Sequence, residues 1–306
     1  MLRAPSDPAR LIRRRTAAGR MLALRRRQGG VTLIEMVVVI AISGILLALV
    51  GMFTRTQISS YSDVANRADL TDAADTALRR MARELQAALP NSVRLSAGGN
   101  MLEFVPVKDA GRYRAQPGGG ASDDPADFTS TTDNSFDVFG PPVQVTAGDQ
   151  LVVFNLGIPG ADVYSSTATS STRRALTKTG TLSNLSYAVG AAQFPFASPQ
   201  NRFHIVGGPV TLECAPNAAN PDLGTLRRHW CYGFAATQPS AFGSLPVYAG
   251  CTAERSAVVV AGVSACTFNY APGALQRNGL VSMRVTLTRN NESITLLHQV
   301  DVVNTP

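Results

Sequence analysis

Residues 29–53 read GGVTLIEMVVVIAISGILLALVGMF, and this stretch sets the architecture of the N-terminal part of the chain. Within residues 31–53 the only charged residue is Glu35. As an α-helix with a rise of about 1.5 Å per residue, this segment would be about 35 Å long, whereas the hydrocarbon core of a bilayer is about 30 Å thick. The sequence therefore predicts a helix that crosses a membrane once.

The charge distribution around this segment predicts its orientation. The chain carries 28 Lys and Arg against 21 Asp and Glu, a formal net charge of +7. Nine of the arginines but only one acid, Asp7, lie in residues 1–30, so subtraction leaves 19 bases and 20 acids in the rest of the chain. By the positive-inside rule, residues 1–30 stay in the cytoplasm and the rest crosses the inner membrane into the periplasm. The nearly neutral remainder disfavours nucleic acid as a partner.

A secretory signal peptide is the first alternative for the N-terminus, because it also joins a basic region to an apolar one. The apolar stretch here is longer than the usual 7–15 residues, and no A-x-A-like site follows it. The small-residue pair Gly29-Gly30 instead precedes it. Cleavage after Gly30 would remove the basic leader and leave the membrane helix on the mature protein.

Glu35 is an unexpected residue in a membrane-spanning segment, where a carboxylate costs about 3 kcal/mol on insertion scales. Cleavage after Gly30 would create an α-amine on Val31, four residues from Glu35. That amine, or the amine of a neighbouring helix, could pair with the carboxylate and so favour a staggered helical bundle. The alternative is a carboxylate that snorkels to the headgroups or stays protonated.

Residues 29–36, GGVTLIEM, followed by the apolar run resemble the class III signal of type IV pilins, pseudopilins and minor pilins. The resemblance implies cleavage after Gly30 by prepilin peptidase, N-methylation of Val31 and a role for Glu35 in subunit assembly. It also implies, as partners, other pilin or minor pilin subunits, the inner membrane and the pilus assembly platform. The location implied is a single-pass inner-membrane protein with a cytoplasmic N-terminus and a periplasmic domain, and later the pilus on the cell surface.

The sequence departs from that family pattern at three places. Val31 stands where Phe is usual, and Met52 stands where major pilins often have a helix-bending proline. The leader is also long, and a start at Met21 would give the shorter leader MLALRRRQGG. We therefore expect Met21 to be the true start, which N-terminal sequencing of the uncleaved precursor would test.

Helical periodicity continues through residues 54–90. Apolar residues recur at intervals of three and four from Ile58 to Ala88, with charged residues mostly on other faces, and Pro90 ends the pattern. The sequence predicts one continuous helix over residues 31–89, whose second half packs an apolar stripe on the globular domain. A coiled coil is the alternative for this second half.

Residues 91–306 are predicted to form one β-rich extracytoplasmic domain. Short apolar or alternating runs occur at 101–107, 150–158, 202–206, 210–214, 257–261 and 266–270. Residues 281–288 and 294–302 alternate in hydropathy on either side of Asn290-Asn291, which predicts a β-hairpin with one buried face. Polar stretches at 117–135 and 165–174 are expected to be surface loops. The predicted fold class is α+β, with a long N-terminal helix packed on a largely antiparallel sheet, as in pilins.

Two further segments are similar to minor pilins of the mannose-sensitive haemagglutinin (MSHA) pilus system, of the MshO type. They are ALRRMARELQAALPNSVRL at 77–95 and the C-terminal run that ends in SITLLHQVDVVN at 293–304. With the N-terminus they cover about a third of the chain. The resemblance implies a minor pilin involved in pilus biogenesis; a type II secretion pseudopilin and an adhesin or DNA-uptake minor pilin are the alternatives.

Four cysteines, Cys214, Cys231, Cys251 and Cys266, lie on the translocated side, where disulfides form. Three pairings are possible. We expect the nearest-neighbour pairing, Cys214 with Cys231 and Cys251 with Cys266, in which each loop contributes about 3 kcal/mol. Zinc is disfavoured because the sequence has no C-x-x-C or H-x-x-x-H spacing.

The sequence offers little support for catalysis or for a cofactor. Its three histidines are His204, His229 and His298, and it contains no G-x-S-x-G, H-E-x-x-H or Walker pattern. We expect His298 to be a buried or interface histidine of the last strand. The acids Asp123, Asp124, Asp127 and Asp133 lack the spacing of an EF-hand, so a solvated loop is expected rather than a Ca²⁺ site. We expect no enzyme activity, no cofactor and no metal.

Nucleic-acid binding would require a basic patch that also carries aromatic residues. The best candidates in the mature chain are Arg173-Arg174-Lys178 and Arg227-Arg228-His229-Trp230. Both patches are small and give only limited support to nucleic-acid binding. A DNA-uptake receptor is therefore kept as an alternative and not as the main prediction. A mature chain of 276 residues is large for a repeating shaft subunit and suits one present in few copies, such as a tip subunit.

Overall fold

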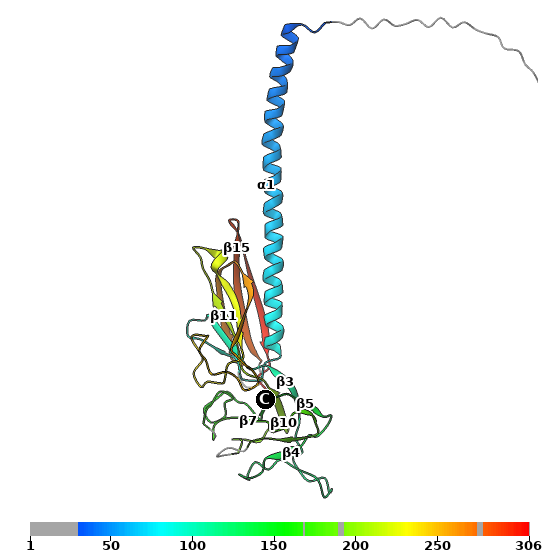
Figure 1. Cartoon of the computed structure of the whole chain (residues 1–306), viewed down its shortest axis with the longest axis vertical. Helices are drawn as coiled ribbons and strands as arrows, with labels where there is room; N and C mark the ends of the chain where they lie inside the picture. The colour runs from blue at the N-terminus through cyan, green and yellow to red at the C-terminus, as the bar shows by residue number, and fades with distance from the viewer. Residues whose placement is uncertain (1–29, 168, 189–192, 274–277, 306) are drawn as a thin grey trace, which may run out of the picture. The chain divides into compact units, whose positions relative to one another are not determined.

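The computed structural model describes residues 30–167, 169–188, 193–273 and 278–305 (Figure 1). The predicted basic leader, apart from Gly30, and the alternative start at Met21 lie outside these residues. The chain divides into two compact units, residues 1–58 and 59–306. One long helix contributes its first part to the first unit and its second part to the second.

Helix α1 runs without interruption from Leu33 to Gln86, which confirms the predicted continuous helix. Gly44 and Gly51 lie inside it, and the helix continues through both. Its C-terminal end comes three residues earlier than the sequence predicted, because the next residues pair with the chain at 105–107: the N–H of Leu89 donates to the carbonyl of Val105, and the N–H of Val107 donates to the carbonyl of Ala87. Asn91 then takes a left-handed conformation with φ 58°.

The second part of α1 packs against two antiparallel sheets. Its buried face carries Leu70, Leu78, Met81 and Leu85, each at most 2% exposed. In Figure 1, strands β11 and β15 run beside this part of the helix. The sequence also placed Tyr61 and Val64 on the packed stripe, but they are 79% and 68% exposed. The prediction was wrong for the part of the stripe before Leu70, because the sheets bury the helix only from that residue onward.

The first of these sheets has five strands and the second has three. The order in the first is β1 (Arg94–Leu95), β2 (Met101–Phe104), β11 (Val210–Ala215), β12 (Thr225–Trp230) and β13 (Arg255–Ala261). The second contains β14 (Val263–Ala271), β15 (Gly279–Arg289) and β16 (Glu292–Val302). A short 3₁₀-helix, η1 (Pro221–Leu223), connects β11 to β12. Every pairing within the sheets is antiparallel, and the α+β prediction is confirmed.

The predicted C-terminal hairpin is confirmed in detail. β15 and β16 pair over their whole length, with Arg289 opposite Glu292. Asn290 and Asn291 form the turn with φ values of 50° and 63°, the left-handed conformation that a two-residue hairpin turn requires. Asparagine tolerates this conformation better than most residues, so the sequence signal and the structure agree.

A second core lies beyond the C-terminal end of α1, in the part of Figure 1 that contains β3, β10 and β4. Its four-stranded sheet has the order β3 (Val107–Arg112), β10 (Arg202–Val206), β6 (Gln150–Val152) and β7 (Arg173–Ala175). Two strand pairs accompany it, β4 (Ser135–Asp137) with β9 (Asn184–Ser186) and β5 (Val143–Val145) with β8 (Gly180–Leu182). Aromatic side chains fill this core, namely Tyr113, Phe136, Tyr187, Phe194 and Phe203. We will call this part the distal lobe.

The distal lobe corrects one sequence-based prediction. Residues 165–174 were expected to be a surface loop, but their end forms the first strand residues of β7, and Thr172 and Arg174 are 1% and 6% exposed. The polar composition misled the prediction because these side chains are buried with hydrogen-bond partners. Thr172, for example, donates its hydroxyl to the Asn155 side chain over 3.2 Å.

Candidate functional site

The N-terminal end of α1 is built by a capping threonine. The hydroxyl oxygen of Thr32 accepts a hydrogen bond from the backbone N–H of Glu35 over 3.3 Å, and the carbonyl of Thr32 accepts from the N–H of Met36 over 3.2 Å. Thr32 is therefore the N-cap residue and Glu35 occupies the third helical position. A carboxylate at this position also interacts favourably with the positive end of the helix dipole.

The Gly30–Val31 peptide bond lies just outside this cap. Gly30 and Val31 precede the helix, and Val31 is 68% exposed. A Cβ atom built on Gly30 would meet no atom within 4 Å. The Gly30–Val31 bond, which the sequence predicts to be cleaved, is therefore exposed among the described residues. The helix begins with the Thr32 cap, outside this bond.

The first part of α1 has an exposed apolar surface. Residues 33–54 have a mean hydropathy of 2.8, and none of them is buried within the described structure. Glu35 is the only acid in this segment, and no contact of its carboxylate with another described residue is recorded. An exposed apolar helix of this length needs lipid or other helices around it, which suggests that it anchors the protein in a membrane.

All four cysteines form disulfides, but the predicted pairing is wrong. Cys214 on β11 is bonded to Cys266 on β14, and Cys231 is bonded to Cys251. The Cα atoms of the two pairs are 6.0 and 5.7 Å apart. The nearest-neighbour prediction considered only distance along the chain, whereas β11 and β14 both face the core beside α1 and bring Cys214 and Cys266 together.

The three histidines lie on different strands and do not form a common site. His204 is on β10, where burial and the neighbouring Arg202 lower its pKa to about 4. His229 on β12 is within 2.7 Å of a Glu213 carboxylate oxygen through Nε2. His298 on β16 is half-buried and lines a shallow pocket beside Arg79 and Arg83 of α1. Among the residues that the structure describes, no three His, Cys, Asp or Glu side chains are grouped as a metal would require.

The four acids of residues 123–133 are bound to their own loop. Asp123 accepts hydrogen bonds from the backbone N–H groups of Gly120 and Gly118, which hold its pKa below the usual value. Asp124 accepts from the Ser135 hydroxyl and the Asn184 amide. Asp127 and Asp133 likewise accept from N–H groups of the same loop. These carboxylates are thus used as hydrogen-bond acceptors that organise the loop.

The two basic patches named in the sequence are largely engaged within the chain. Arg173 donates to the carbonyl of Val163 over 2.8 Å, and Arg174 donates to the carbonyls of Ser171 and Gln193. Arg228 pairs with Glu84 of α1 over 2.7 Å. Most of these guanidinium groups therefore stabilise the fold rather than point to a partner.

A buried polar network, which sequence reasoning missed, lies on the face of the five-stranded sheet that turns away from α1. The carboxylate of Glu103 on β2 is fully buried and pairs with Arg94 over 2.6 Å. The Tyr232 hydroxyl donates to Glu103 over 3.0 Å and lies 2.5 Å from the Thr211 hydroxyl. Arg94 also donates to the carbonyls of Ala235 and Ala236, which lie in the segment closed by the Cys231–Cys251 disulfide. The network thus fixes that segment over the sheet.

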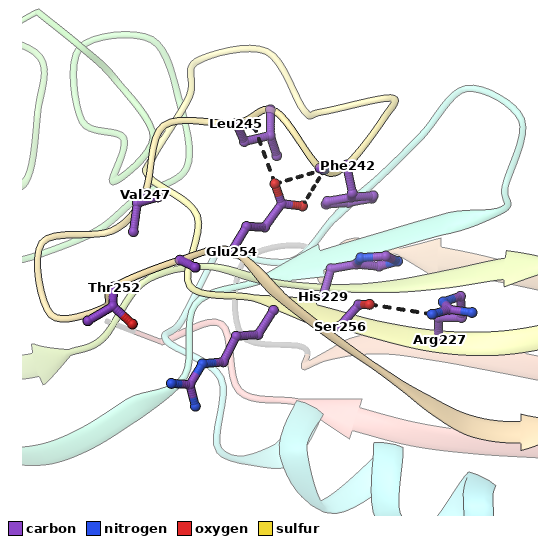
Figure 2. A pocket seen from close by; sticks show the side chains of 11 residues that line it. Arg227, His229, Phe242, Leu245, Val247, Thr252, Glu254 and Ser256 are labelled. Atoms are coloured by element: carbon purple, nitrogen blue, oxygen red, sulfur yellow. Dashed lines mark hydrogen bonds between the residues drawn. The ribbon is translucent and has the colours of Figure 1, made fainter.

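A pocket of about 480 Å³ opens beside the same segment (Figure 2). In Figure 2 the Glu254 carboxylate faces the loop above it and accepts from the N–H groups of Gly243 and Leu245. The rings of His229 and Phe242 stack with centroids 3.8 Å apart, and Arg227 donates to the Ser256 hydroxyl. The Glu254 carboxylate thus holds the loop of Gly243 and Leu245 in place, and the Phe242 ring covers the wall of the pocket that carries His229. This arrangement supports loop structure and offers no nucleophile aligned with a base.

Comparison with known proteins gives one match, at the N-terminus. Residues 25–51 match the model of the prokaryotic N-terminal methylation motif. No curated protein and no solved structure is significantly similar to the chain. The matched residues contain the Gly30–Val31 bond, the Thr32 cap and Glu35, so the N-terminus carries a type IV pilin-like class III signal. The motif implies processing by prepilin peptidase and assembly with other pilins.

Proposed function

We propose that this protein is a minor pilin of a type IV pilus of the MSHA kind, with a structural rather than an enzymatic role in pilus biogenesis. Prepilin peptidase cleaves after Gly30, and the new amine of Val31 is methylated. The protein then resides in the inner membrane, with its N-terminus in the cytoplasm and the β-rich domain in the periplasm. From there the pilus assembly platform transfers it into a filament.

The observation that carries this proposal is the exposed apolar helix with a single acid at its capped start. Its 22 residues from Leu33 to Thr54 bury nothing within the described structure. In a filament, neighbouring helices cover this surface, and the Glu35 carboxylate pairs with the Val31 amine of a neighbouring subunit. The division of the chain into two units supports separate roles for the helix and the β-rich domain. Among the described residues, the core residues and both disulfides lie in residues 59–306.

The assignment to the MSHA kind rests on the sequence resemblance at residues 77–95 and 293–304. A type II secretion pseudopilin has the same N-terminal signal and is the alternative, and so is an adhesin or DNA-uptake minor pilin. Isolation of sheared pili distinguishes the first two. A minor pilin is recovered with the pilus fraction, whereas a pseudopilin is recovered only with the cell envelope of a strain that carries the secretion system.

The Glu35 mechanism is tested by Glu35→Ala in the producing cell. We expect the variant to insert into the membrane and to be cleaved, since the cap at Thr32 and the apolar surface remain. Its amount in the sheared pilus fraction should fall well below that of the wild type. Thr54→Ala, at the other end of the apolar segment, is the matched control and should leave incorporation unchanged. Normal incorporation of Glu35→Ala would contradict the mechanism.

A further inference from the structure

Two arginines of the distal lobe face each other without an acidic partner. Arg112 on β3 is directly opposite Arg202 on β10 in the antiparallel register. Directly opposite side chains lie on the same face, with Cβ atoms about 5 Å apart, and like charges in this position are destabilising. Neither guanidinium has an ion pair or hydrogen bond recorded with any residue that the structure describes. The fold thus holds two uncompensated positive charges side by side.

An exposed aromatic ring adjoins this pair. The N–H of Phe139 donates to the carbonyl of Arg112 over 2.7 Å, which fixes the two residues next to each other. The Phe139 side chain is nevertheless 65% exposed, whereas Phe136, Phe194 and Phe203 of the same lobe are buried. No contact of the ring with another aromatic ring is recorded among the described residues.

Phe139 and Arg112 line a pocket of about 410 Å³, together with Gln116 and Asn201. A pocket of this size is within the range of small-molecule sites. The fourth polar residue of the pocket, Arg114, is already neutralised, because it pairs with Asp137 over 3.2 Å and with Asp123 over 3.6 Å. The pocket therefore combines one flat apolar wall, neutral amide groups and the free guanidinium of Arg112. Arg202 lies outside the lining but directly opposite Arg112 on the neighbouring strand, which extends the cationic edge.

We propose that this surface binds single-stranded nucleic acid, with a phosphate on Arg112 and Arg202 and a base stacked on Phe139. Guanidinium groups bind phosphate oxygens in a bidentate manner, and two of them side by side suit one phosphodiester with its neighbours. Aromatic rings beside a cationic edge are the usual platform for bases of a single strand. The amides of Gln116 and Asn201 are placed to hydrogen-bond with base edges.

This inference revises the sequence-based view of nucleic acid as a partner. That view rested on the near-neutral charge of the mature chain and on basic residues adjacent in sequence. Arg112 and Arg202 are 90 positions apart, and only the pairing of β3 with β10 brings them together. The net charge of residues 31–306 is nevertheless nearly zero, because acids elsewhere in the chain balance these two arginines in number.

The test uses a fluorescein-labelled oligothymidylate of about 12 nucleotides and the full chain in nonionic detergent micelles. Binding is measured by fluorescence anisotropy at several salt concentrations. The double variant Arg112→Gln/Arg202→Gln should reduce the slope of log K against log salt by about 1.4, since each lost phosphate contact on a single strand contributes about 0.7. Phe139→Ala should weaken binding by about fivefold to 150-fold.

The matched control is Arg284→Gln/Arg289→Gln, which removes two exposed arginines of β15. This control should leave the slope unchanged. Because every variant keeps the N-terminal arginines, their contribution to binding is the same in all of them and cancels in the comparison. As a local probe, the indole introduced by Phe139→Trp should be quenched by the oligonucleotide. Thermal unfolding of every variant confirms that the lobe is folded.

Two results would overturn the proposal. In the first, both double variants lose the same affinity, which indicates general electrostatic attraction. In the second, dextran sulfate binds with the same dependence on Phe139 as the oligonucleotide, and the surface is then a site for acidic polysaccharides. Loss of slope only in Arg112→Gln/Arg202→Gln, together with quenching of the introduced indole by the oligonucleotide alone, supports it.

Discussion

Arg94 and Glu103 form an ion pair whose two members should contribute unequally to stability. Arg94→Ala would leave the Glu103 carboxylate fully buried, with the Tyr232 hydroxyl as its remaining side-chain partner. Removal of one member of a buried pair costs about 3–5 kcal/mol, because a buried charge is left uncompensated. For a domain of this size, that loss lowers the melting temperature by about 10 °C.

Glu103→Gln should cost much less than Arg94→Ala. Burial raises the pKa of Glu103 above its usual value, against the opposing effect of Arg94, so the folded protein already penalises the charged form. The amide keeps the size of the side chain and can still accept from Tyr232. Arg94 is 21% exposed and retains its bonds to the carbonyls of Ala235 and Ala236. We expect a loss of about 1.5–3 kcal/mol, the net contribution of one hydrogen bond to a charged group.

The pH dependence gives a second readout for the same pair. A carboxyl group with a raised pKa in the folded state contributes stability below its ordinary pKa of 4.5, and this stability is lost as the pH rises through the folded pKa. Arg94→Ala removes the group that lowers this pKa, so its pKa rises further. The loss caused by Arg94→Ala should therefore shrink between neutral pH and pH 4.5. The double variant Arg94→Ala/Glu103→Gln should lack this recovery.

The assay is urea unfolding of the full chain in nonionic detergent with intact disulfides, followed by the fluorescence of Trp230, the single tryptophan of the sequence. Equal losses for Arg94→Ala and Glu103→Gln at neutral pH would refute the reasoning. So would a loss in Arg94→Ala that is independent of pH, since the uncompensated charge of Glu103 would then not be its cause.

Three further predictions concern the domain of residues 59–306. Leu85→Ala, in the fully buried face of α1, should lower the free energy of unfolding by about 2–5 kcal/mol in the same assay. The paired change Cys231→Ala/Cys251→Ala, which opens a loop with a sequence separation of 20, should cost about 3 kcal/mol, and a cost near zero would mean that the Arg94 network alone holds the segment. Asn291→Val places a β-branched residue at φ 63° and should cost about 1–2 kcal/mol, whereas Asn291→Gly should cost nothing; equal melting temperatures for the two variants would contradict the turn geometry.

Features that depend on local sequence could be predicted, and those that depend on distant pairing could not. The periodicity of residues 54–88 and the Asn290-Asn291 turn each lie within one stretch of chain, and the structure confirms both. The end of the packed stripe could not be predicted, because whether Tyr61 is covered depends on how far the sheets extend along the helix. The disulfide pairing and the Arg112–Arg202 pair depend on which strands become neighbours, and no single stretch contains that information.

The prediction at the N-terminus likewise depends on residues that are close together in the sequence. Gly30 and Glu35 lie within six residues, and their spacing before the apolar run carries the predicted cleavage position and assembly residue. The capping role of Thr32 was not predicted and comes from the structure. The network of Glu103, Tyr232 and Thr211 left no such signal. Each of these residue types is common in strands and loops. The burial of the Glu103 carboxylate results from the packing of distant segments and has no signal in the local sequence.

The Cys214–Cys266 disulfide has a mechanical consequence in the proposed filament, where the chain would be under tension. It joins β11 to β14 across a sequence separation of 52, and the Cys231–Cys251 disulfide lies inside that loop. If the molecule is stretched between its ends, the residues enclosed by the bond cannot extend, which removes about 180 Å from the length that the unravelled chain could reach. A large part of the β-rich domain is thereby shielded from a pulling force even after the rest of the domain has yielded.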